Sequence, residues 1–260
     1  MPMDNSIADR ARNLIEDHLV PYRHTALLVA IISLLGGRAS VGGTGVGAAI
    51  YSILVMLVLM VAVYTIQVDE LYGDQELLVR QRKKRGFIGW ALAIVAIVLH
   101  LSLFVSPSHT LAVAGSLSLL LFFGFVALTE LRAVLRQKTV TRETISMSIS
   151  VYLLFGLTWG FFYLVLFEFQ PNAFGFGGAP APSELQIPPV LIYFSLTTIA
   201  TVGYGDITPL TLQARYAAVA EGIAGQFYLA ILVARLVGMQ MSQSPSQPAE
   251  NKTVDSKTKV

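Results

Sequence analysis

The sequence predicts an all-α integral membrane protein with six transmembrane helices and a short re-entrant helix between the fifth and sixth spans. Only 13% of its 260 residues are charged, against roughly 25% in ordinary soluble domains. Hydrophobic residues make up 54% of the chain, and the mean hydropathy is +0.64. So few charged residues could not cover the surface of a single soluble domain, and the high apolar content excludes a disordered chain.

Apolar stretches of roughly 20 residues, the length that a bilayer crossing requires, identify the spans. Four stretches meet it: residues 48–66, 86–105, 111–130 and 147–167. A fifth, residues 214–239, is interrupted by Glu221 and Arg235, and a sixth, residues 25–36, is the shortest. The Gly-rich residues 36–47 and the Gly- and Pro-rich residues 171–183 are expected to form external loops.

The positions of the basic residues predict the orientation, because Lys and Arg concentrate on the cytoplasmic side. With six spans, every Lys and Arg except Arg38 and Arg215 falls on one side. Both termini are therefore expected to be cytoplasmic, in a plasma or inner cell membrane. Residues 1–23 read as a cytoplasmic amphipathic segment, since apolar residues recur there at helical spacing. Residues 24–146 form a four-span membrane domain, and residues 242–260 are polar and expected to be disordered.

Residues 187–209 carry the most informative pattern. The apolar run 187–200 is too short to cross a bilayer and contains Pro188 and Pro189, so it should enter and leave on the outer side. Non-helical backbone at membrane depth is tolerated where it is buried in protein or lines a wet cavity. Gly203 and Gly205 permit dihedrals that other residues avoid, so successive carbonyl groups can face one side.

Residues 201–206, Thr-Val-Gly-Tyr-Gly-Asp, resemble the selectivity filter of potassium channels, and residues 147–241 resemble the pore domain of that family. The resemblance implies K⁺ sites lined by the carbonyls of Thr201, Val202, Gly203 and Tyr204, with Gly205 completing the filter. It implies no cofactor, because K⁺ is the permeant ion. One pore segment supplies a quarter of a ring, so a homotetramer is expected.

The resemblance also implies supporting residues. Asp206 would sit at the outer mouth, and Thr197 occupies a position that is Glu in some relatives, so the carboxylate pair of those relatives is unavailable. Glu221 is expected behind the filter, hydrogen-bonded to hydroxyls of the short helix 187–200 such as Thr197 or Thr198, and the alternative is a structural polar contact. Gly225 is expected to be a gating hinge, and the alternative is close packing against the pore helix, residues 187–200.

Three other expectations concern function. Residues 111–130 contain no Lys or Arg, so no steep voltage dependence is expected from this span. No catalytic motif occurs, and the net charge of +2 gives no reason to expect nucleic acid. Two rivals stay open beside a selective potassium channel: a less selective cation channel, and a non-conducting regulatory subunit that keeps the pore fold.

Overall fold

The computed structural model describes residues 22–41, 45–71, 79–106, 108–178, 182 and 186–243. The amphipathic helix expected within residues 1–23 and nearly all of the expected disordered tail lie outside this part. The helices are α2 (Arg23–Val41), α3 (Gly45–Leu71), α4 (Val79–Val105), α5 (His109–Arg136), α6 (Arg142–Phe169), α7 (Ile187–Ile199) and α8 (Leu212–Gln243). The strands β1 (Phe174–Gly175) and β2 (Thr208–Pro209) pair antiparallel.

Five helices, α3, α4, α5, α6 and α8, are long and apolar enough to cross a membrane. Each contains one of the five longer apolar stretches that the sequence predicts as spans, which confirms an all-α membrane protein. The apolar part of α2, Arg23–Gly37, is shorter than a full span by the same measure.

Local sequence explains where several helices begin. The Ser108 side chain accepts a hydrogen bond from the Leu111 N–H and caps α5. Thr141 and Thr144 form a capping box that starts α6. Proline stands in the first turn of α7, where the missing N–H has no helical partner to lose.

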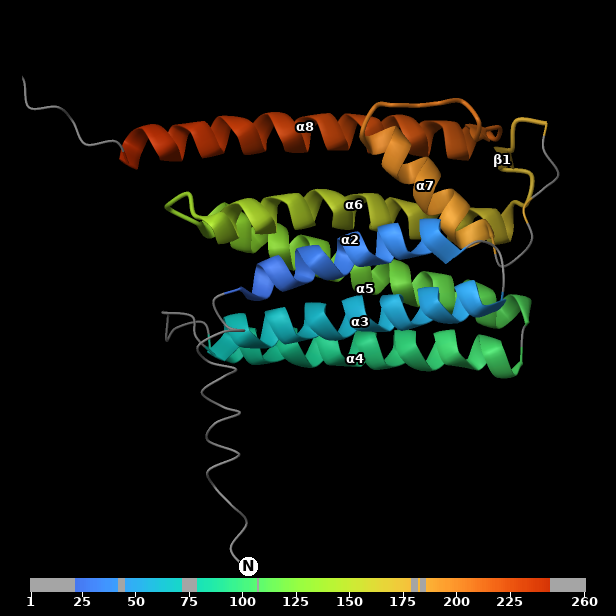
Figure 1. Cartoon of the computed structure of the whole chain (residues 1–260), viewed down its shortest axis with the longest axis horizontal. Coiled ribbons are helices and arrows are strands. Elements are labelled where there is room, and N and C mark those ends of the chain that lie inside the picture. The colour runs from blue at the N-terminus through green and yellow to red at the C-terminus, as the bar shows by residue number, and fades with distance from the viewer. Residues whose placement is uncertain are drawn as a thin grey trace, which may run out of the picture.

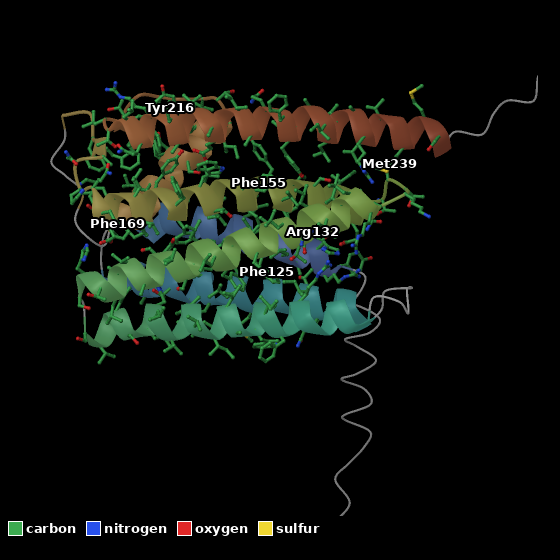
Figure 2. All side chains as sticks on the ribbon, turned by 180° about the vertical axis from the view of Figure 1, so that it is seen from behind. Phe125, Arg132, Phe155, Phe169, Tyr216 and Met239 are labelled. Atoms are coloured by element: carbon green, nitrogen blue, oxygen red, sulfur yellow. The ribbon has the colours of Figure 1, made fainter. Side chains whose placement is uncertain are left out.

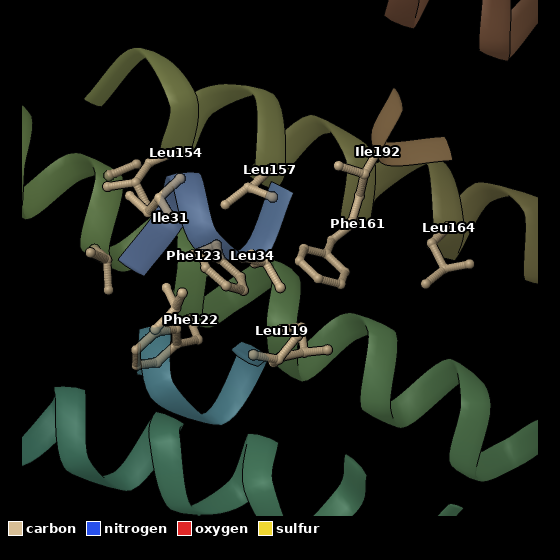
Figure 3. Packing of buried hydrophobic residues seen from close by; sticks show 14 of the residues in the cluster. Ile31, Leu34, Leu119, Phe122, Phe123, Leu154, Leu157, Phe161, Leu164 and Ile192 are labelled. Atoms are coloured by element: carbon tan, nitrogen blue, oxygen red, sulfur yellow. The ribbon is translucent and has the colours of Figure 1, made fainter. Parts of the chain in front are cut away.

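The long helices run side by side, while α7 lies inclined between α6 and α8 (Figure 1). Buried apolar side chains join α2, α3, α5 and α6 in one core that extends to Ile192 on α7 (Figure 3). Phe123 of α5 and Phe161 of α6 stack there with ring centroids 5.1 Å apart. The first helices and the C-terminal helices therefore share a core through α6.

Polar side chains connect α2 to its neighbours at one end of the helix bundle. Arg132 and Met239 lie at one end, and Phe169 and Tyr216 lie at the other (Figure 2). At the Arg132 end, a buried hydrogen bond of 3.0 Å joins His24 Nδ1 to Glu130 Oε2, which links α2 to α5. The Thr25 hydroxyl donates to Glu143 Oε1 at 2.7 Å and links α2 to α6.

Two loop predictions need correction. Residues 36–41 were expected in a Gly-rich loop, but the backbone of α2 continues through Val41, because helical hydrogen bonding tolerates glycine at a modest energetic cost. The expected loop 171–183 contains β1, whose partner β2 comes more than thirty residues later. A two-residue strand leaves no periodic pattern in the sequence, so only its distant partner reveals it.

Candidate functional site

The sign of the backbone dihedral φ alternates along residues 201–205, the segment that follows α7. Thr201, Gly203 and Gly205 have positive φ values of 57°, 53° and 79°, whereas the residues between them do not. Among the described residues, Thr201 is the single non-glycine with positive φ. Such a conformation is strained for a β-branched side chain and marks functional sites. An alternation of left- and right-handed residues turns successive carbonyl groups to the same side of the chain.

Main-chain hydrogen bonds fix the start of this segment to the end of α7. The carbonyl of Thr197 accepts from the N–H groups of Val202 and Gly203, at 2.8 and 3.2 Å. The carbonyl of Thr198 accepts from the Thr201 N–H at 2.9 Å. These bonds satisfy carbonyl groups that a helix end leaves without partners. The hydroxyls of Thr197 and Thr198 both donate to the Phe194 carbonyl, so they bond within α7.

Tyr193 holds the end of the segment. Its hydroxyl donates to Asp206 Oδ2 at 2.9 Å, and its ring stacks on Tyr204 with centroids 6.5 Å apart and planes 2° from parallel. The other Asp206 oxygen accepts from the Ile207 N–H at 3.0 Å. The hydrogen bond to Asp206 raises the pKa of the Tyr193 hydroxyl, so this hydroxyl remains a donor at neutral pH.

Glu221 lies behind α7 and is 0% exposed. Glu221 hydrogen-bonds to a hydroxyl of α7 as expected, but that hydroxyl belongs to Ser195 and not to Thr197 or Thr198. The Tyr163 hydroxyl donates to Glu221 Oε2 at 2.7 Å, and the Ser195 hydroxyl hydrogen-bonds to Glu221 Oε1. Because both threonines bond to their own helix, the carboxyl is left to Ser195 and Tyr163. The three residues tie α6, α7 and α8 together.

Glycine allows the helices around α7 to approach closely. A Cβ on Gly225 of α8 would lie 2.5 Å from Ile199 Cγ1 and 2.9 Å from the Ile199 carbonyl oxygen. A Cβ on Gly160 of α6 would lie 2.9 Å from Ile192 Cα, and one on Gly156 would lie 2.6 Å from Leu196 Cδ2. These contacts support the close-packing alternative for Gly225, and the hinge at Gly225 stays a prediction. The helix α8 is uninterrupted at this residue.

Four site residues went unassigned in the sequence: Tyr193, Ser195, Tyr163 and Tyr152. Tyr152 donates to the Ile199 carbonyl at 3.0 Å and anchors the end of α7 to α6. All four are hydroxyl residues in apolar helices, where a polar group requires a partner. The energetic cost of an unpaired hydroxyl in such a helix indicates that each of these residues has a hydrogen-bond partner, but it does not identify the partner.

An ion could be bound by clustered acidic or His side chains, or by the 201–206 segment. Within the described part of the chain, no group of three or more His, Asp or Glu residues could hold a metal ion. The residues from Thr201 to Asp206 are all exposed in the single chain. This segment is therefore open to an ion or to another protein surface.

One comparison with known proteins gives a match that includes this region. Residues 151–241 match the family model described as "Ion channel". The matched range includes most of α6, β1, α7, the 201–205 segment, β2 and nearly all of α8. No curated protein and no solved structure matches the chain. The family match and the five apolar helices support a multi-pass membrane protein with an ion-channel domain.

Proposed function

We propose that the protein is a potassium-selective channel that conducts K⁺ passively through a homotetrameric pore. The observation that carries the proposal is the positive φ at Thr201, Gly203 and Gly205 within Thr-Val-Gly-Tyr-Gly. This alternation aligns the carbonyls of residues 201–204, and rings of such carbonyls replace the hydration shell of K⁺. The Thr201 hydroxyl closes the innermost site.

A homotetramer explains the surfaces that the single chain leaves open. Val202 and Tyr204 are 50% and 71% exposed, although a filter needs rigid support. Large apolar side chains also lie exposed along α8: Tyr216, Val219, Ile223, Phe227, Ile231, Val233 and Val237. No further helix lies on the side of α8 away from α6 (Figure 2). Neighbouring copies around a fourfold axis would cover both surfaces.

Six spans with both termini cytoplasmic fit the helix lengths. The 19 residues of α2 extend about 28 Å at 1.5 Å per residue, close to the roughly 30 Å hydrocarbon thickness. Leu27, Ile31 and Leu34 of α2 are buried in the shared core, so the helix lies within the bundle. The 13 residues of α7 extend only about 20 Å, which suits a re-entrant pore helix. The Arg132 end of the bundle is then cytoplasmic.

The remaining residues support the filter. Thr197 and Thr198 anchor it through main-chain oxygens, Asp206 closes its outer end, and Glu221 holds α8 behind α7. Gly225 is the proposed hinge of α8. The helix dipole of α7 directs partial negative charge from its C-terminal end toward the cation path.

Flux through purified protein in liposomes tests this function, with K⁺ inside and Na⁺ outside. The expected reversal potential lies near the K⁺ equilibrium value. Gly203→Ala should abolish K⁺ flux, because a Cβ disfavours the required backbone. Tyr204→Ala should weaken selectivity, because it removes the ring that stacks on Tyr193. Gly238→Ala is the matched control, since a Cβ there meets nothing within 4 Å.

The two rivals give different results. A less selective cation channel gives a measurable flux with a reversal potential near zero. A non-conducting subunit forms tetramers that pass no ion in any K⁺ gradient, at any membrane voltage. Selective flux retained in both Gly203→Ala and Tyr204→Ala would contradict the filter assignment.

A further inference from the structure

We infer that the outer loop, residues 171–178, is a positioning element that holds the outer end of the filter in its selective geometry. The inference rests on the proposed potassium-channel function and assigns a role to a segment outside the filter and the pore helix. Three independent sets of contacts carry it: strand pairing, a close approach of two main chains, and an aromatic anchor.

Strand pairing attaches the outer loop to the segment that follows Asp206. Phe174 pairs with Pro209 and Gly175 pairs with Thr208, in antiparallel register. The Leu210 N–H donates to the Ala173 carbonyl at 2.7 Å, next to the pair. In an antiparallel ladder, hydrogen-bonded and non-hydrogen-bonded pairs alternate. Phe174–Pro209 is thus a non-hydrogen-bonded pair, where proline loses no ladder bond.

The main chain of Gly177 lies against the main chain of Asp206. A Cβ on Gly177 would lie 3.0 Å from the Asp206 carbonyl oxygen. Gly177 also has a positive φ of 58°, so glycine is favoured there for its backbone and for its contact. Asp206 is therefore held twice, by Tyr193 at its carboxylate and by the outer loop at its main chain.

An aromatic anchor connects the outer loop to the helices behind the filter. Phe174 is buried, and its ring lies 5.6 Å from that of Tyr163 on α6 and 5.3 Å from that of Phe194 on α7. Edge-to-face pairs at such separations are favourable beyond the area they bury. Tyr163 also donates to Glu221 on α8. The outer loop is thus anchored directly to α6 and α7, and through Tyr163 to α8.

These contacts place the outer loop in a mechanical role. Moving the main chain of Asp206 would shift its carboxylate from the Tyr193 hydroxyl, and the adjacent Tyr204 ring from its stack on Tyr193. Selectivity depends on the spacing of carbonyls fixed by this stack. The outer loop therefore acts on selectivity through Asp206, without touching the ion.

The test compares Gly177→Ala with Gly178→Ala in the liposome assay. Both glycines have positive φ, 58° and 80°, so both substitutions strain the backbone. Only the Cβ at residue 177 meets Asp206, whereas a Cβ at residue 178 meets nothing within 4 Å. We expect Gly177→Ala to lower the K⁺-over-Na⁺ permeability ratio about tenfold, since small misplacements of positioned groups have large effects. Gly178→Ala should keep the wild-type ratio.

Amide hydrogen exchange gives a second readout that does not require conduction. We expect faster exchange in residues 206–210 for Gly177→Ala than for Gly178→Ala, because the displaced loop releases the Leu210 N–H. A general loss of stability would lower the amount of folded channel but would leave the reversal potential of the surviving channels unchanged.

The outcomes separate the inference from the proposed function. Equal permeability ratios and equal exchange in both variants would overturn the role of the outer loop and leave a selective wild-type channel standing. A wild-type reversal potential near zero would overturn the proposed function, and with it the effect on selectivity. A lowered ratio confined to Gly177→Ala, with faster exchange at 206–210, supports the inference.

Discussion

The hydrogen bonds around Glu221 predict a small effect on stability for Glu221→Gln and a large loss for Glu221→Ala. The Tyr163 hydroxyl donates to one carboxyl oxygen at 2.7 Å. Ser195 Oγ lies within hydrogen-bond distance of the other oxygen and also of the Gly156 carbonyl, at 2.6 Å. A serine hydroxyl has one proton and cannot donate to both. A protonated carboxyl that donates to Ser195 satisfies every contact at once.

A glutamine reproduces this pattern, because its amide N–H donates to Ser195 and its carbonyl accepts from Tyr163. We expect Glu221→Gln to change the free energy of unfolding by less than about 1 kcal/mol. Glu221→Ala removes the acceptor of Tyr163, which is fully buried. An unsatisfied buried hydroxyl costs about 1–3 kcal/mol, and a hydrogen bond between membrane helices is worth up to about 1.7 kcal/mol. With the cavity left by the side chain, a loss of about 3 kcal/mol is expected.

Unfolding of the purified protein in detergent measures these differences through tryptophan fluorescence. The chain has 2 Trp residues, and the ring of Trp159 lies 6.1 Å from that of Tyr163, so its emission reports on this region. Tyr163→Phe is the intermediate control, because it removes one hydroxyl and no volume. A Glu221→Gln protein as unstable as Glu221→Ala would refute the hydrogen-bond pattern in which residue 221 donates to Ser195 and accepts from Tyr163. An unchanged Glu221→Ala protein would refute the tie between the three helices.

Three further substitutions test the packing between helices. Gly225→Ala should destabilise the fold by about 1–3 kcal/mol through overpacking, whereas Gly222→Ala, whose Cβ meets nothing within 4 Å, should be neutral or stabilising in the same unfolding measurement. If instead Gly225→Ala kept stability and slowed channel opening, the hinge role would be favoured over packing. Arg235→Lys should lower stability by about 1 kcal/mol, because the guanidinium donates to two main-chain carbonyls at the end of α5, at 2.6 and 2.9 Å; an unchanged melting temperature would contradict this cap. His24→Leu should cost about 1–3 kcal/mol, because it removes the donor that faces the buried Glu130, without changing the reversal potential; the control Glu130→Gln keeps an acceptor for His24 and should cost less.

The long helices could be predicted from the sequence because membrane insertion depends on composition and length. Residues 48–66, for example, contain no charged residue, and α3 contains them all. The proposed filter segment was also recognisable, because Thr-Val-Gly-Tyr-Gly after a short apolar run resembles the potassium-channel motif. Both kinds of information are local in the chain, so a single sequence carries them.

The partners of polar residues could not be predicted in the same way. Glu221 is 26 residues from Ser195 and 58 residues from Tyr163. The sequence alone does not distinguish which hydroxyl of α7 hydrogen-bonds to its carboxyl. The choice is made by competition, because Thr197 and Thr198 bond to the Phe194 carbonyl of their own helix. The same reason hides the β1–β2 pair, whose register depends on how α6, α7 and α8 pack.

The helix α6 belongs to both halves of the protein, and this determines how the first four helices can influence the pore. One of its faces places Leu157 and Phe161 in the core shared with α2 and α5, and another face places Gly156 and Gly160 against α7 (Figure 3). A displacement of α6 therefore moves the pore helix directly, because close-packed helices have no free volume to absorb it. The C-terminal half of α8 has a separate connection, since Arg235 donates to the end of α5. Two physical routes thus lead from the N-terminal helices to the proposed pore. One passes through α6 and α7 to the 201–205 segment, and the other passes through Arg235 to the C-terminal end of α8.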